Sequence, residues 1–509
     1  MRALKDGGAA MLVIVSDLHL TDGSTGETIP PGAFSIFARR LKELAVAASW
    51  RADGSYRPIA RIDVVLLGDV LDVIRSARWL ARSNVRPWGN PHAPEFVDQV
   101  TRITDQILQN NADALAVLRG LTVDGGLSVP PALRVARPDH RSEGQPVPVR
   151  IHYMVGNHDW FYHLPGPNYD TLRRTVIEHM GLANCADRPF PHDITESDEL
   201  LSTMRRHKAT ARHGDQFDPF NFEEDRDAGS LGDVIVIELI NRFSAEVEWG
   251  LGGELPAATV VGLREIDNVR PLLLIPVWID GLLERTCPQP AVRKRVKTVW
   301  DRLADELLGI EFVRQRDTWS PFDLVDGLER ALKFSKRLSI GWASSIVDWI
   351  GKICGSSGSS YHRHALTEPD FRNRRAKHVV YGHTHTAEIV PLDASYAEGY
   401  VLDQTYFNAG TWRRVYGRTQ LAPGEHEFIA SDVMTYLAFF QGDERKGRPY
   451  ETWSGTLGHR FEEITVHRID PGGASDVTGQ PVPTPSLQDH APHFTTPSVK
   501  PDAFPPSGV

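Results

Sequence analysis

The stretch Tyr381-Gly382-His383-Thr384-His385 follows the short apolar run His378-Val379-Val380. Two histidines one residue apart, at the end of a buried strand, can direct two imidazoles towards the same small volume. The pattern alone is weak, because Gly-His-x-His sequences also form ordinary turns. Its interpretation therefore depends on whether other parts of the chain supply similar side chains.

Four further segments carry Asp, His or Asn immediately after an apolar run: Asp17-Leu18-His19, Gly68-Asp69-Val70-Leu71-Asp72, Gly156-Asn157-His158-Asp159 and His213-Gly214-Asp215. Because ligand sites of α/β proteins form at the carboxyl ends of strands, the five segments predict one site assembled from the whole chain. Their side chains are of the kinds that Mn, Fe and Zn accept. A carboxylate such as Asp69 can bridge two cations, and two cations ~3.5–4 Å apart can clamp a phosphate and activate water.

Apolar runs alternate with segments of helical periodicity through the first part of the chain. The pattern predicts strands at 11–16, 62–67, 149–155 and 208–212, and helices at 34–48, 95–118 and 169–180. The Pro- and Gly-rich residues 120–148 are interpreted as a loop. Strands alternating with helices predict a layered α/β fold.

The pattern changes after Asp215. Residues 220–365 show helical periodicity, with one apolar stripe from Leu324 to Trp349 and a Gly/Ser run at 355–360. Strands are predicted again at 377–381, about 387–391, 400–407, 427–439 and 461–469. We therefore expect four parts: a core beginning at 11–219, a helical insertion at 220–365 acting as a cap or lid, the rest of the core at 366–470, and a disordered Pro-rich tail at 471–509.

Composition narrows the function classes. The 509 residues carry a net charge of -10, which disfavours a general nucleic-acid surface. Cys185, Cys287 and Cys354 are far apart and odd in number, so they suggest neither a disulfide framework nor a zinc ribbon. The sequence shows no convincing signal peptide and no run of ~20 apolar residues. These features predict a cytoplasmic protein.

Taken in order, the five loops resemble those of the calcineurin-like metallophosphoesterase superfamily, over residues 11–215 and 377–470. The resemblance implies a metallophosphoesterase β-sandwich flanked by helices. It also implies two divalent metal ions (Mn, Fe or Zn), bridged by Asp69. One would be held by Asp17, His19 and His385, and the other by Asn157, His213 and His383.

His158 matches the family's general acid, which protonates the leaving oxygen, and Asp72 matches the carboxylate that orients it. A leaving alkoxide needs such a proton donor, and a buried carboxylate keeps a histidine protonated. Asp72 has an alternative role as a helix cap. Asp159 and Asp215 are expected to orient ligands or cap turns, and His152, His163 and His207 are given structural roles.

The resemblance implies a dinuclear metallophosphoesterase that cleaves a phosphate ester or pyrophosphate with a hydroxide generated at the metals. The insertion would select a phosphorylated small molecule. Its position after His213 is similar to that of the lid in UDP-2,3-diacylglucosamine hydrolases, although those enzymes usually carry Arg where this chain has His158. A nucleotide phosphodiesterase and a nuclease are other candidates. A protein phosphatase is disfavoured, because Ile74 and Arg75 replace the expected Arg-Gly after Val73.

Two non-catalytic properties are also considered. The fold could serve as a metal-binding scaffold that recruits partners through the insertion. The basic run Arg293-Lys294-Arg295-Val296-Lys297 is interpreted either as a solvated helix face or as a contact for anionic lipid.

Overall fold

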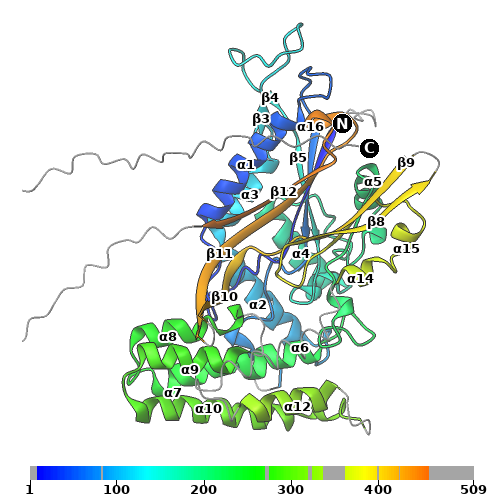
Figure 1. Ribbon diagram of the computed structural model, residues 1–509. Helices are drawn as coiled ribbons and strands as arrows, with labels where there is room; N and C mark the ends of the chain where they lie inside the picture. Colours follow the sequence, from blue (N-terminus) through cyan, green and yellow to red (C-terminus); the bar gives the residue numbers. More distant parts are fainter. Residues whose placement is uncertain are drawn as a thin grey trace, which may run out of the picture. The chain divides into compact units, whose positions relative to one another are not determined.

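The computed structural model describes residues 9–81, 84–269, 274–318, 324–335, 361–397, 400–422 and 425–457. All of them lie in one compact unit, 1–458. The unit is mixed α/β, with two main sheets and helices around them (Figure 1). The predicted strand 461–469, the tail 471–509, the run 355–360 and the end of the apolar stripe lie outside the described residues.

The larger sheet has a parallel half and an antiparallel half. The parallel half consists of β1 (Ala10–Val15), β2 (Arg61–Leu67) and β5 (Val149–Met154). The antiparallel half consists of β10 (Arg413–Ala422), β11 (Glu425–Phe439) and β12 (Tyr450–Leu457). The strand order is β10-β11-β1-β2-β5, and β12 also pairs with β11.

The smaller sheet has the order β6-β7-β9-β8. Its strands are β6 (Ala209–Ala211), β7 (His378–Tyr381), β9 (Tyr400–Asn408) and β8 (Glu388–Ala397). β7 is parallel to both β6 and β9, with Ala211 opposite Val380. This pairing places the segment after β6 beside the paired-histidine loop after β7.

Side chains of β1 alternate between two apolar clusters, as expected for a strand buried on both faces. Met11, Val13 and Val15 pack in the cluster that includes the helical residues. Leu12 and Ile14 pack in a cluster shared by strands of both sheets. The helices of the first cluster are α1 (Gly32–Ala48), α2 (Pro94–Asn110), α3 (Ala112–Thr122) and α4 (Pro167–Met180).

Three local expectations need correction. The single helix predicted at 95–118 is two helices that break at Asn111, whose side-chain amide donates to Ile107 O and Thr21 O. Residues 120–148 are not all loop, because they contain the end of α3 and the hairpin β3 (Ser128–Val129) and β4 (Gln145–Pro146). Strands β10 and β12 were not predicted, because their sequences are polar and interrupted by Gly417 and Gly455.

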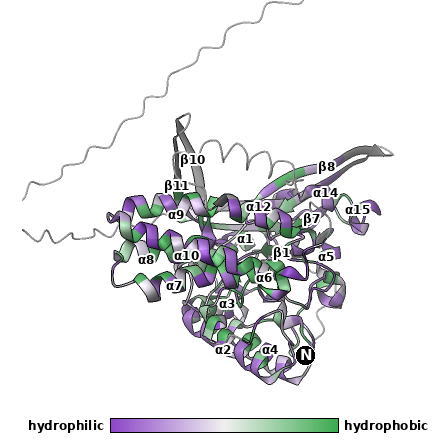
Figure 2. Ribbon diagram, turned by 90° about the horizontal axis from the view of Figure 1, so that it is seen from below, coloured by the Kyte–Doolittle hydropathy of each residue, from purple (hydrophilic) through white to green (hydrophobic). Residues whose placement is uncertain are grey.

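The described part of 220–365 is helical. Its elements are α6 (Leu231–Val234), the π-helix η5 (Ile235–Asn241), α7 (Arg242–Leu251), α8 (Ala257–Arg264), η6 (Ile266–Asn268), α9 (Ile275–Thr286), α10 (Pro290–Leu308), α11 (Glu311–Arg314), α12 (Leu324–Ser335) and α14 (His362–Ala365). Polar and apolar residues alternate along α7 to α10 (Figure 2). Most of the apolar residues form a separate cluster that includes Trp278, Val296 and Leu303. Val236 and Ile237 of η5 pack instead in the cluster that contains α1 to α4.

The shorter elements lie mainly in the connections. They are η1 (Ala77–Ala81), η2 (Trp160–His163), η3 (Ile194–Glu196), α5 (Asp198–Arg206), η4 (Asp215–Phe217), α15 (Pro369–Arg372) and α16 (Glu444–Gly447). Within the described ranges, none of the helices combines the length and the apolar character needed to cross a bilayer.

The basic run lies on α10, where Val296 is buried. Arg295 forms an ion pair with Glu254 at 2.6 Å, and Lys297 lies 3.8 Å from Asp280. Two of the four cations of this run therefore have acidic neighbours within the insertion. Contact of the run with anionic lipid stays a prediction.

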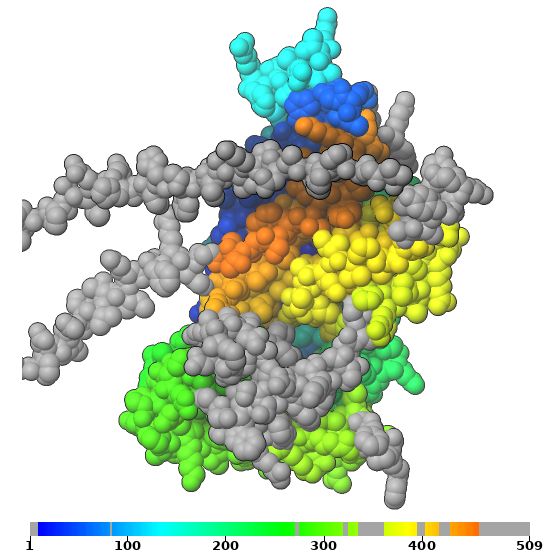
Figure 3. Space-filling model, viewed as in Figure 1, coloured from blue at the N-terminus to red at the C-terminus, as the bar shows by residue number. Residues whose placement is uncertain are grey.

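The helices of the insertion contact the strands through a buried charge cluster. Figure 3 shows the green helices of the insertion below the orange strands. Val269 forms a bridge with Tyr416 of β10. Beside it, the Asp267 Oδ2 atom lies 3.0 Å from Arg75 Nε and 2.9 Å from Arg413 Nη2. All three side chains are buried, and this carboxylate compensates the charge of both guanidinium groups.

We expect Asp267→Ala to lower the free energy of unfolding by about 3–5 kcal/mol, because it leaves two buried guanidinium groups without their shared carboxylate. Thermal unfolding followed by circular dichroism measures the effect. The control is Glu43→Ala, which removes an exposed pair with Arg40 and should cost under about 1 kcal/mol. Equal effects of the two substitutions would contradict the assignment.

Candidate metal centre

Side chains from five loops, each following a strand, meet in one place. The loops after β1, β2 and β5 come from the larger sheet, and those after β6 and β7 come from the smaller sheet. One group consists of Asp17, His19, Asp69 and His385; the other consists of Asp69, His213 and His383. Within each group the ligand-type atoms lie within 4.8 Å of one another, and Asp69 belongs to both.

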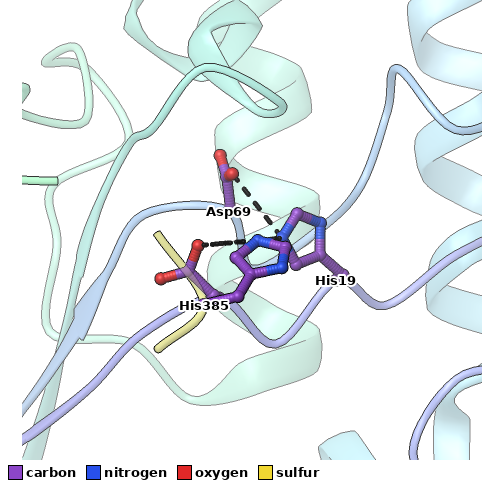
Figure 4. A group of neighbouring side chains, drawn as sticks. His19, Asp69 and His385 are labelled. Atoms are coloured by element: carbon purple, nitrogen blue, oxygen red, sulfur yellow. Dashed lines mark hydrogen bonds and ion pairs between the residues drawn. The ribbon is translucent and has the colours of Figure 1, made fainter. Parts of the chain in front are cut away.

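The first group surrounds a small buried volume. His385 Nε2 lies 3.2 Å from Asp17 Oδ1 and 2.9 Å from His19 Nε2. His19 Nε2 lies 3.6 Å from Asp69 Oδ2. Figure 4 shows the side chains of His19, Asp69 and His385 pointing towards one another from three separate segments.

The second group includes an amide oxygen. His213 Nε2 lies 3.3 Å from Asp69 Oδ2 and 3.2 Å from Asn157 Oδ1. Asn157 Oδ1 is also 3.0 Å from His383 Nδ1. All seven residues expected to bind metal thus lie in one cluster, and their division between two metal ions stays a prediction.

The carboxylates fit bound cations. Asp17 Oδ1 and Asp69 Oδ2 are buried and accept no hydrogen bond. A buried carboxylate oxygen without a donor is costly, so native proteins rarely leave one. Both oxygens face imidazole nitrogens, and a divalent cation between these groups would compensate them. The donor set of carboxylate, imidazole and amide suits Mn, Fe or Zn.

The Asp69 carboxylate is oriented so that one of its oxygens faces both groups of side chains. Its Oδ1 accepts a hydrogen bond from the His158 backbone N–H at 2.8 Å. Its Oδ2 is left between His19 and His213, which belong to different groups. One oxygen therefore faces both halves of the centre.

Hydrogen bonds on the far side of three of the imidazoles, those of His19, His213 and His383, fix which nitrogen faces the cluster. Asp72 Oδ2 accepts from His19 Nδ1 at 2.7 Å, and Leu67 O accepts from His213 Nδ1 at 2.9 Å. Asp218 Oδ2 accepts from His383 Nε2 at 3.0 Å. Histidines that bind metals commonly donate their other N–H in this way, which orients the ring and raises its basicity.

The predicted proton donor shares a carboxylate with a predicted metal ligand. Asp72 Oδ1 lies 2.7 Å from His158 Nδ1, while its other oxygen holds His19. Burial lowers the pKa of His158, but the charges of Asp72 and then Asp69 outweigh it and raise the pKa to about 9. Asp72 Oδ1 also accepts from the Arg75 N–H at 3.0 Å and so closes a turn. The next helical element, η1, begins only at Ala77, so the alternative role of Asp72 as a helix cap does not apply.

The ionisation of the carboxylates follows from the same geometry. Burial raises the pKa of Asp17, but the facing imidazoles, His213 foremost, hold that pKa well below its ordinary value. The pKa of Asp69 is lowered for the same reason, despite its burial. Both groups are therefore carboxylates at neutral pH, which is the form that binds metal.

The backbone of the loops is strained where the ligands are attached. Asp17, His19, Asp69, His383 and His385 have φ values between 46° and 67°. A non-glycine residue held in this region costs about 1–3 kcal/mol and persists only where its surroundings fix it. Such strain in five ligand residues supports a functional constraint on these loops.

The remaining expected residues have structural partners. Asp159 accepts hydrogen bonds from the Gly156 and Val70 amides and from the Tyr153 hydroxyl, so it holds two of the loops together. Asp215 pairs with Arg226 at 2.7 Å. Thr411 Oγ1 donates to Asp17 O from beneath the site.

Sequence reasoning missed two residues at the place where the chain passes from the core into the insertion. Asp218 orients His383, and Asn221 Oδ1 accepts from Asn157 Nδ2 at 3.2 Å. Both follow the His213 loop within eight residues, but neither is part of an apolar run that ends in ligands. Their nearness to His213 is the only signal in the sequence that points to them.

No family model matches this chain, and no curated protein matches it. The geometry of the site is therefore the basis for a functional assignment.

We expect Gly156→Ala to abolish metal binding. A Cβ at this position would collide with Asp69 Oδ1 and lie 2.7 Å from His213 Nε2, so one of these side chains must move. Elemental analysis of the desalted protein measures the metal content. Gly250→Ala is the control, because a Cβ in this part of α7 meets no atom within 4 Å; it should keep the metals and stabilise the helix by about 0.5–1 kcal/mol. Full metal content in Gly156→Ala would contradict the assignment.

We expect Asp218→Ala to weaken metal binding about 10–100-fold, because His383 loses the group that orients it. Asp218→Asn should recover part of the affinity, since an amide oxygen still accepts the His383 N–H. Calorimetric titration of metal-stripped protein gives both affinities. Unchanged affinity in the alanine variant would show that Asp218 does not act through His383.

Proposed function

We propose that this chain is a metallophosphoesterase of the calcineurin-like type, a dinuclear metal-dependent hydrolase of phosphate esters or pyrophosphates. The observation that carries the proposal is the joint placement of two features. Six ligand-type side chains converge on a shared Asp69, and His158, held by Asp72, lies beside them. A hydrolase needs both parts, whereas a purely structural metal site needs only the first.

Asp17, His19 and His385 would hold one cation, and Asn157, His213 and His383 the other, with Asp69 between them. When bound, two such cations neutralise phosphate charge and lower the pKa of water, which supplies a nucleophile near neutral pH. The chain's own contribution is to fix the number and direction of the ligands through Asp72, Asp218 and the Leu67 carbonyl.

His158 is proposed to donate a proton to the leaving oxygen. Its Nδ1 proton is held by Asp72, so Nε2 is the atom from which the proton is given. The His158 side chain is 13 % exposed, so a substrate can reach it. After transfer the imidazole stays oriented by Asp72, and it recovers a proton from solvent.

The helical insertion is proposed to select the substrate. The chain already takes part in the site where it enters the insertion, because Asp218 and Asn221 bond to His383 and Asn157. A phosphorylated small molecule fits this arrangement better than nucleic acid, given the net charge of -10. A UDP-2,3-diacylglucosamine hydrolase-like pyrophosphatase, a nucleotide phosphodiesterase and a nuclease are the alternative substrate classes.

The test uses full-length, metal-stripped protein with Mn, Fe, Zn or Mg added back. Hydrolysis of p-nitrophenyl phosphate and its bis ester is measured, together with nucleoside diphosphate esters. We expect metal-restored turnover in the wild type, and its loss in Asp69→Asn together with loss of bound metal.

His158→Ala should keep its metals but lose about 10²–10⁴-fold in rate. The loss should be larger for an alkyl phosphate than for p-nitrophenyl phosphate, because nitrophenolate leaves without help from a proton donor. His179→Ala, on the exposed face of α4, is the matched control and should behave as the wild type.

A wild-type protein that binds two metals but hydrolyses none of these substrates would refute the general phosphoesterase proposal and favour the metal-binding scaffold. An equal loss for both leaving groups in His158→Ala would assign His158 to positioning instead of proton donation.

A further inference from the structure

A second cluster of metal-ligating side chains lies outside the centre described above. His163, His192 and Asp227 place their ligand-type atoms within 4.8 Å of one another. His163 Nδ1 lies 2.7 Å from Asp227 Oδ1 and 2.9 Å from Oδ2, and His192 Nε2 lies 3.1 Å from Oδ1. The centroids of the two imidazole rings are 4.3 Å apart. One nitrogen of each ring faces the Asp227 carboxylate.

The three residues come from three connections. His163 ends η2, just after the loop that carries Asn157 and His158. His192 precedes η3, and Asp227 lies between η4 and α6, where the chain enters the insertion. The sequence spacing does not mark them as a set, because 29 and 35 residues separate them and none follows an apolar strand.

Glu196 determines which nitrogen of His163 faces the Asp227 carboxylate. Its Oε2 lies 3.3 Å from His163 Nε2 and accepts the His192 backbone N–H at 3.0 Å. When His163 Nε2–H donates to Glu196, the Nδ1 lone pair faces the Asp227 carboxylate. Lone pairs at this distance repel one another unless a proton or a cation lies between them.

The two carboxylates of the cluster leave room for a cation of higher charge than one proton. Asp227 and Glu196 are two carboxylates, and the nearby Arg226 is paired with Asp215 at 2.7 Å. One divalent cation would compensate both carboxylates and accept both imidazole nitrogens. A carboxylate behind a metal-binding histidine, as Glu196 is here, is a common feature of zinc sites.

We propose that His163 Nδ1, His192 Nε2 and the Asp227 carboxylate bind one further divalent transition-metal ion, with zinc as the best match to two imidazoles and a carboxylate. The side chains of His163 and Asp227 are 23 % and 29 % exposed, so a water molecule can take the fourth position.

Such an ion would fasten the first residues of the insertion to the core. Asp227 belongs to the connection that contains Asp218 and Asn221, which bond to His383 and Asn157. His163 and His192 belong to the loops beside strand β5. This proposal is independent of the proposed hydrolysis. In the hydrogen bonds and ion pairs given above, His163, His192 and Asp227 bond to none of the seven residues of the main cluster.

The experiment compares the metal content of full-length wild type and variants. Protein is stripped with chelator, reloaded with Zn²⁺, desalted and analysed for zinc per chain. We expect His163→Ala and the isosteric Asp227→Asn each to bind one equivalent less than the wild type. His179→Ala, an exposed histidine on α4, should lose none. Because the result is a difference, it does not depend on how many ions the dinuclear centre holds.

Reloading with Co²⁺ gives a second measurement. A site with two imidazoles, a carboxylate and water should contribute visible absorption bands of four-coordinate cobalt, and Asp227→Asn should lose them while its circular dichroism stays that of the wild type. Equal zinc content in the wild type and both variants would overturn the proposal and identify the cluster as an ion-pair network. The same conclusion would follow from cobalt bands that Asp227→Asn leaves unchanged.

Discussion

The site depends on buried negative charge that hydrogen bonds compensate only on one oxygen of each carboxylate. Asp69 and Asp17 each keep one carboxylate oxygen without a donor, and both oxygens face imidazole nitrogens. Burying such groups costs free energy unless a cation is supplied. The other features of the site follow from this requirement: Gly156 makes room beside Asp69, and Asp72 turns His19 towards the cluster.

Two sheets are needed to build this arrangement. The larger sheet supplies the loops after β1, β2 and β5, and the smaller sheet supplies those after β6 and β7. Residues 366 positions apart, such as His19 and His385, therefore meet in one volume. Since the ligands come from distant parts of the chain and sit on strained backbone, metal binding and folding should be coupled. A bound cation would offset the strain that the loops store.

The insertion is joined to the chemistry at its beginning and to the strands farther along. Asp218 orients His383, while Asp267 compensates Arg75 and Arg413 in the contact with β10. Arg75 lies just after Asp72, the carboxylate that holds the predicted proton donor His158. The contact with β10 therefore also borders the loop that carries Asp72. Movements of the helical part would therefore reach the site through a few defined residues, and on this basis we propose that it takes part in substrate selection.

The sequence by itself determined the mixed α/β character, the strands that carry the ligands, and the seven ligand-type residues of the main cluster. It could do so because each ligand-type residue follows a short apolar run. This local pattern can be recognised in the sequence without knowledge of the fold. Only the tertiary structure decided the rest. The break at Asn111, the polar strand β12, the roles of Asp218 and Asn221, and the cluster of His163, His192 and Asp227 all depend on partners far away in the chain. Local sequence records which side chains a strand delivers to its end, whereas the pairing of strands and the packing of connections decide which side chains meet there.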